Sequence, residues 1–160
     1  MKRALPLILA LALSSPLAVF AAETAHDHAH APGAELVIEL NNGQKWEIDA
    51  PLRKGMEGIQ TAAQTALERV HANTATADDY ALFNKQIGDE MAYITNCKLE
   101  PKADEQLHGV LAQIQAGAEA AQGAQGDAKR ADGVTTVIEA LNAYGDYFDH
   151  SGWQKIDLGH

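Results

Sequence analysis

Apolar residues recur every three or four positions along most of the chain, which is the spacing of one buried face of an α-helix. Asp49 and Pro51 supply an N-cap and an early-turn proline, and they predict a first helix that continues to about His71. The seam of this helix consists of apolar or small residues at alternating steps of four and three: Leu52, Met56, Ile59, Ala63, Ala66 and Val70. Such a seam is typical of a helical bundle.

Three further segments repeat the pattern. Their predicted starts are Thr76, with Asp79 three residues later as an approximate capping box, then Glu100 with Pro101, and finally Asp127. The apolar positions are, in chain order, Tyr80, Phe83, Ile87, Met91 and Ile94; Leu107, Leu111, Ile114 and Ala118; and Val134, Val137, Leu141, Tyr144 and Phe148. Short turns between helices of similar length predict antiparallel neighbours. We therefore expect a mainly α protein, an up-down-up-down four-helix bundle.

The residues ahead of the first helix predict a β-hairpin. A β-branched run at 35–40 is followed by the turn Asn41-Asn42-Gly43 and by a second alternating run at 44–48. An isolated hairpin is marginal in water, so we expect Trp46 to anchor it on the bundle. The tail that begins at Ser151, with Trp153 and Ile156, is expected to fold back on the hairpin.

The first 21 residues predict export. Lys2 and Arg3 form a basic start, residues 5–19 an apolar core, and Val19-Phe20-Ala21 a small-x-small cleavage site, which are the three parts of a signal peptide. No cysteine stands directly after the apolar core, which argues against a lipid anchor, and no later stretch predicts a membrane span. We expect cleavage near Ala21 or Ala22 and a periplasmic location.

The mature chain has the length of one domain, about 140 residues. After the signal peptide (1–21) we expect a flexible histidine-rich tail at 22–33 and a hairpin-plus-bundle domain at 34–160. Without the two basic residues of the signal peptide, ten basic residues face twenty-two acidic ones, a formal net charge of −12. This charge argues against nucleic acid and anionic lipid as partners, and it favours cationic ligands.

Three histidines alternate in the predicted tail: His26, His28 and His30. We call residues 26–30 the histidine arm. Near pH 7 its imidazoles are partly neutral and can together chelate Cu(II), Zn(II) or Ni(II). The alternative is a solvated tail whose histidines have no common role.

The predicted topology gathers further candidate ligands at one end of the bundle. The first helix starts there, the second ends, the third starts and the fourth ends, and these segments carry Met56, Met91, Cys97, Asp104, His108 and His150. Soft sulfur with imidazole selects Cu(I), so we expect copper first, bound by Cys97, His108 and the methionines. Zn(II) would instead use Cys97 and His108 with Asp104 or His150. Asp104 precedes His108 by one turn and would orient its ring.

Each of these residues also has a structural interpretation. The methionines occupy seam positions, where methionine usually fills the core. A single cysteine cannot form an internal disulfide, so Cys97 is a buried small side chain, a bridge between two chains, or a ligand. His108 lies about 100° from the centre of its helix's buried face, and His150 can cap the fourth helix.

The sequence lacks residues that a di-iron site, covalent haem or nucleophilic catalysis would require. Glu105-x-x-His108 is one half of a di-iron motif without a second copy, and no Cys-x-x-Cys-His occurs for covalent haem. Cys97 and His108 could form a nucleophile and base, but nothing in the sequence indicates an oxyanion hole. We therefore expect no enzymatic activity. The leading hypothesis is a periplasmic metal-binding protein that sequesters or delivers an ion, copper first.

Two alternatives stay open. One is an interaction module in which the hairpin edge and Trp46 or Trp153 dock another periplasmic protein, and in which metal binds only to the tail. The other is a bundle that binds haem non-covalently.

Two resemblances bear on these hypotheses. The layout resembles the periplasmic four-helix cytochromes of the b-type and c-prime class, with Met56 at the position of the b-type axial methionine and His150 roughly where their histidine lies, which implies non-covalent haem. Three motifs resemble a group of small exported proteobacterial proteins: Gly43-Gln44-Lys45-Trp46, Asp49-Ala50-Pro51-Leu52-Arg53, and Asn96-Cys97-Lys98-Leu99-Glu100-Pro101 with Ala103-Asp104 and Leu107-His108. The second resemblance covers most of the mature chain and implies export and a bundle without supplying an activity.

Overall fold

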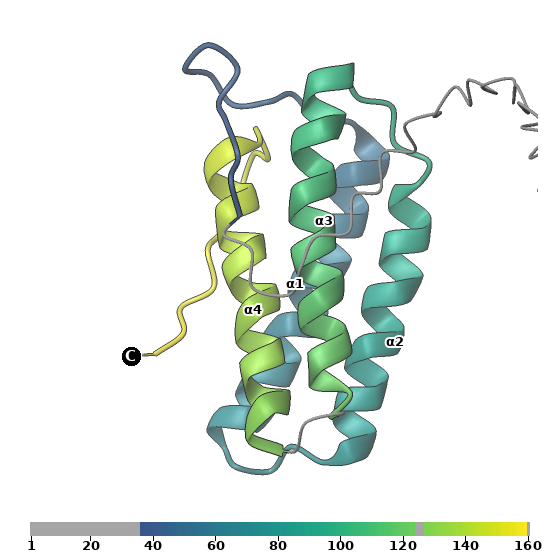
Figure 1. Ribbon diagram of the computed structural model, residues 1–160, viewed down its shortest axis with the longest axis vertical. Coiled ribbons are helices and arrows are strands. Elements are labelled where there is room, and N and C mark those ends of the chain that lie inside the picture. The colour runs from purple at the N-terminus through teal and green to yellow at the C-terminus, as the bar shows by residue number, and fades with distance from the viewer. Residues whose placement is uncertain (1–35, 124–126, 160) are drawn as a thin grey trace, which may run out of the picture.

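Four α-helices make up most of the computed structural model, which describes residues 36–123 and 127–159. They are α1 (Ala50–His71), α2 (Ala77–Ile94), α3 (Pro101–Ala121) and α4 (Asp127–Tyr147). The helices lie side by side and alternate in direction (Figure 1), and each packs on its neighbours in chain order, with α4 closing on α1. The predicted mainly α, four-helix fold is confirmed. The predicted signal peptide and histidine-rich tail lie outside the described residues.

Local sequence signals set the helix starts. The Asp49 Oδ1 atom accepts the Leu52 N–H at 3.0 Å, which satisfies one of the free donors at the start of α1. At α2 the Thr76 side chain accepts the Asp79 N–H at 3.2 Å, and the Asp79 carboxylate accepts the Thr76 N–H at 2.9 Å. This is the capping box that the sequence predicts. Each helix begins within one residue of its predicted start.

The predicted seams form the core. Most of their residues are buried, and several are completely inaccessible, including Leu52, Met56, Ile59, Ala63, Ile114, Val137 and Leu141. Three of the predicted positions, Val70, Met91 and Leu111, are only partly buried at the edge of this core. None of the described helices combines the length and apolarity that crossing a bilayer requires.

Helices α3 and α4 approach until their backbones touch. A β-carbon added at Gly133 would lie 2.5 Å from the Ala121 nitrogen and 2.5 Å from the Gly117 oxygen. One added at Gly117 would lie 2.7 Å from the Gly133 oxygen. Because backbone atoms cannot rotate aside, only glycine fits at this crossing, and the two glycines fix how closely the helices pack.

Replacing Gly133 with alanine should therefore destabilise the protein, by about 1–3 kcal/mol, since the helices must move apart. Gly88→Ala is the matched control, because a β-carbon at Gly88 in α2 meets nothing within 4 Å. Relief of the helical glycine should stabilise that variant by about 0.5–1 kcal/mol. Urea unfolding of both variants checks this. Equal effects would show that the crossing is not tightly packed.

The predicted β-hairpin is not shown by the described residues. Only its turn forms, with Asn42 and Gly43 at φ 52° and 83° and one antiparallel bridge between Asn41 and Gln44. The flanking backbone groups find other partners: the Glu39 N–H donates to the Gln106 side chain at 2.8 Å. Residues 36–48, which we call the strap, therefore cross the end of the bundle, and the Asn41–Gln44 bridge is their one β-bridge to each other.

Trp46 joins the strap to the end of α4. Its N–H donates to the Tyr147 carbonyl and its carbonyl accepts the Asp149 N–H, both at 2.8 Å. The indole Nε1–H donates to the Glu39 carbonyl at 2.6 Å, and the residue is only 4% exposed. The prediction that Trp46 anchors this segment on the bundle is thus confirmed, although the hairpin itself is not shown.

Residues 148–159, the C-terminal segment, turn back along the outside of α4 (Figure 1). The Asn142 amide exchanges two hydrogen bonds of 2.9 Å with the backbone of Ile156, and Gln60 donates to the Gln154 carbonyl at 2.7 Å. The prediction that this tail folds back on the hairpin is wrong. It packs on α4 and α1, because their side chains satisfy its backbone groups and cover Ile156.

Candidate functional site

The candidate ligands at the end of the bundle lie in different environments. Met56 is completely buried in the core, where a methionine fills space. Met91 and Cys97 are half-buried at the edge of the core. His108 projects into solvent, with 72% of its side chain exposed. An ion shared by Met56 and His108 would therefore require the core to open.

Cys97 lies in the turn between α2 and α3, where its N–H donates to the Ile94 carbonyl at 2.8 Å. Burial raises the pKa of its thiol, and the negative charges of Asp49 and Asp104 raise it further. Because the thiolate is both the nucleophile and the metal ligand, this environment disfavours both roles.

We expect Cys97 to react slowly with a thiol reagent in the native protein, since it is shielded and its thiol stays protonated near neutral pH. The rate should rise at least several-fold in the same protein unfolded in urea, which is the internal control. A native rate as fast as the unfolded one would show that Cys97 is accessible and ionised.

His108 and Asp104 are neighbours, as their spacing of four residues predicts. The His108 Nδ1 atom lies 2.8 Å from the Asp104 backbone carbonyl and 3.5 Å from its carboxylate. A carbonyl oxygen can only accept, so Nδ1 carries the proton and, in the neutral ring, Nε2 keeps its lone pair. Asp104 thus orients the ring in the way that metal-bound histidines usually require.

His150 is a buried residue with a different set of partners. Its side chain is 2% exposed, its Nε2 atom lies 3.2 Å from the Glu57 carboxylate, and its Nδ1 atom lies 3.1 Å from the Tyr144 hydroxyl. A carboxylate only accepts, so Nε2–H donates to Glu57 and Nδ1 accepts the Tyr144 O–H. Both nitrogens of the neutral imidazole are thereby satisfied. His150 and Met56, which the haem alternative pairs, are both engaged inside the fold.

Aromatic rings enclose this imidazole. Tyr144 stacks on Phe148 with ring centroids 4.9 Å apart, and Trp153 lies 4.7 Å from the His150 ring and 5.0 Å from the Tyr144 ring. A β-carbon at Gly145 would lie 2.4 Å from the Trp153 indole, so glycine is needed beneath it. Sequence reasoning missed this cluster, which we call the His150 node (Glu57, Tyr144, Phe148, His150 and Trp153). The only local signal is the spacing of aromatic residues around His150.

Burial lowers the pKa of His150, and the positive charge of Arg53 acts in the same direction, whereas Glu57 opposes it. Burial also raises the pKa of Tyr144, so that its hydroxyl remains a donor to His150. Since the unfolded chain then binds the His150 proton more readily than the folded one, stability should fall as the pH drops through 6.5, the ordinary histidine value.

We therefore expect the free energy of unfolding to decrease between about pH 7.5 and about pH 5.5, and this slope to be smaller in His150→Gln. The glutamine cannot take up a proton in this range. His71→Gln is the control, because His71 is exposed at the other end of the bundle. Urea titrations at several pH values measure the slope. An unchanged slope in His150→Gln would contradict a buried neutral imidazole.

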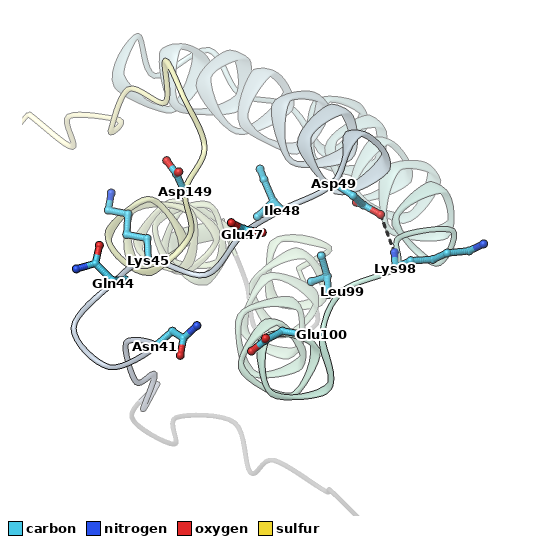
Figure 2. Close-up of a pocket in the computed structure, with 10 residues that line it drawn as sticks. All are labelled: Asn41, Gln44, Lys45, Glu47, Ile48, Asp49, Lys98, Leu99, Glu100 and Asp149. Carbon is cyan, nitrogen blue, oxygen red and sulfur yellow. Dashed lines mark hydrogen bonds between the residues drawn. The ribbon is translucent and has the colours of Figure 1, made fainter.

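A polar cleft of about 710 Å³ lies where the strap meets the starts of α1 and α3 (Figure 2). Its lining includes four carboxylates and two lysines: Glu47, Asp49, Glu100, Asp149, Lys45 and Lys98. The second Asp49 oxygen accepts the Lys98 N–H at 2.6 Å, and Lys45 donates to the Gly145 carbonyl at 2.6 Å. Figure 2 shows the Lys98 side chain pointing away from the opening. The cleft is acidic, but much of its polar lining already serves the fold.

Within residues 36–123 and 127–159, no three histidine, cysteine, aspartate or glutamate side chains come together in a group that could hold a metal ion. The structure does bring Asp104 to His108, and it places His150 with Glu57. His26, His28 and His30 lie outside the described residues. Comparison of the chain with protein-family models, curated proteins and solved structures finds no match.

Proposed function

We propose that this chain is an exported, non-catalytic protein that binds a transition metal, copper first, for sequestration or delivery, and that the histidine arm takes the ion. The observation that carries the proposal is the alternation of His26, His28 and His30, which offers three imidazoles within five residues. Three imidazoles on one short segment suit Cu(II), Zn(II) and Ni(II). The basic start and apolar core of residues 1–21 support export to the periplasm.

Contacts within the bundle favour the histidine arm, rather than the predicted sulfur site, as the place where the ion binds. Met56 is a core residue, the Cys97 thiol has a raised pKa, and both nitrogens of His150 are hydrogen-bonded. Each would have to leave an existing environment before it could ligate. The arm belongs to the predicted flexible tail, and the negative charge of the chain favours the approach of a cation.

A triple variant, His26→Ala with His28→Ala and His30→Ala, should lose most of the Cu(II) affinity of the mature protein, because at least two imidazole ligands disappear. The matched control is Cys97→Ser with Met91→Leu, which should retain that affinity. Competition against a chelator of known affinity measures both. If the control loses the affinity and the triple variant retains it, the ion is bound at the sulfur site and the proposal is wrong.

A second function is favoured by one feature of the surface. Val37 and Leu40 of the strap are 78% and 42% exposed, beside a depression of about 430 Å³ that Trp46 and the start of α3 also line. Exposed apolar side chains at a depression suit contact with another protein. This interaction module becomes the leading function if neither variant changes metal affinity.

A further inference from the structure

We propose that residues 150–159 of the C-terminal segment form a pH-controlled latch: when His150 takes up a proton, these residues leave α1 and α4 while the four helices stay folded. The inference concerns a conformational change of the bundle, so it is independent of where the protein binds a metal ion. His150 couples the two events, because its buried imidazole holds the start of these residues against both helices.

The first argument is the hydrogen bonding of the His150 ring. In the neutral ring, Nε2–H donates to Glu57 at 3.2 Å and Nδ1 accepts the Tyr144 O–H at 3.1 Å. A protonated ring carries hydrogen on both nitrogens, so Nδ1 can no longer accept. The Tyr144 hydroxyl must then turn its hydrogen away, and it has no second partner within the described residues. Protonation therefore leaves a buried donor unpaired, which disfavours the closed latch.

The second argument is the charge around the ring. Arg53 and Glu57 face it from α1 and Tyr144 faces it from α4, while Asp49 acts on the Tyr144 hydroxyl. Glu57 favours an imidazolium, but its side chain is 56% exposed, so water screens its charge. The ring itself is 2% exposed. Burial, helped by Arg53, lowers the pKa of His150, so the ring takes up a proton more readily once it is in water.

The third argument is how few contacts hold the rest of the latch. The Asn142 side chain exchanges two bonds of 2.9 Å with the backbone of Ile156, which is the one buried residue between 151 and 159. Bonds at exposed positions compete with water and add little stability. Three further contacts with α1 and α4 are of this kind: Arg53 with the Ser151 carbonyl, Gln60 with the Gln154 carbonyl, and Asp146 with the Lys155 ammonium.

Trp153 makes the closed latch less stable. Its indole Nε1 atom is buried and finds no hydrogen-bond partner in residues 36–123 and 127–159. A β-carbon at Gly145 would lie 2.6 Å from this nitrogen, so the indole is pressed against α4. A buried N–H without a partner is costly, and water satisfies it when the latch is released. Loss of the neutral His150 bonds therefore shifts a balance that is already close.

The helices keep their own packing when the latch is released. The atoms nearest to Gly117 and Gly133, where α3 and α4 cross, all belong to those two helices. Residues 150–159 lie on the outside of α4 and not between the helices (Figure 1). Release thus breaks a few peripheral contacts, and such a local opening requires less free energy than unfolding of the whole bundle.

Amide hydrogen exchange of the protein tests the latch. The reporters are the Trp153 N–H, bonded to the His150 carbonyl at 3.0 Å, and the Ile156 N–H, bonded to Asn142 at 2.9 Å. Their protection factors, each taken relative to the unstructured chain at the same pH, should fall by up to about tenfold between about pH 7.5 and about pH 5.5, because opening takes up one proton. The Leu141 N–H within α4 should be far more protected at every pH.

His150→Gln is the variant that removes the proton site. It should abolish the pH dependence of both protection factors, whereas His108→Gln, which changes an exposed histidine on α3, should retain it. Circular dichroism checks that both variants are helical. The latch is wrong if His150→Gln keeps the wild-type pH dependence. It is also wrong if the two reporters are as protected as Leu141 in the wild-type protein, because these residues then open only when the bundle unfolds.

A second measurement uses the wild-type protein alone. In an NMR pH titration, the imidazole signals of His150 and the amide signals of Trp153 and Ile156 should change with one midpoint below pH 6.5, the ordinary histidine value. The Leu141 amide signal should keep its folded position through that midpoint. A His150 ring that titrates while both reporters stay unchanged, or that stays neutral until the helices unfold, would overturn the latch.

Discussion

The end of the bundle depends on one buried imidazole. A buried polar ring must find partners for both nitrogens, and His150 finds them on two different helices, Glu57 on α1 and Tyr144 on α4. This requirement fixes the turn after α4. The same turn presents the Asp149 N–H, which donates to the carbonyl of Trp46 in the strap. The strap and the C-terminal segment are therefore both held by the geometry around His150.

The same packing separates the candidate ligands into residues that are held inside the fold and one that is exposed. His150 and Met56 are enclosed by packing that the bundle needs, and Cys97 is held in a turn where burial keeps its thiol protonated. His108, in contrast, is exposed, and its contacts with Asp104 of its own helix use Nδ1 alone. Of the predicted cluster, Met56, Cys97 and His150 thus serve the packing of the fold, whereas His108 is exposed to solvent.

Local signals account for what could be predicted. The caps at Asp49 and Thr76 and the three-four seam act within a few residues, so the helices and most of the core follow from the sequence. The hairpin is not shown, since Trp46 pairs with residues near 148, and the role of His150 is missed because Glu57 lies 93 positions away. Periodicity carries no information about such distant hydrogen-bond partners.

The division between buried and exposed candidate ligands bears on how an ion could be exchanged. A carrier has to load and release its ion, and a site enclosed by a close-packed core would require the core to open at each step. Under the proposed function, the imidazoles of His26, His28 and His30 would exchange an ion without disturbing Gly117, Gly133 or the His150 node. The proposed function therefore places the ligands outside the packed helices, so that ion exchange would leave the close packing of the core unchanged.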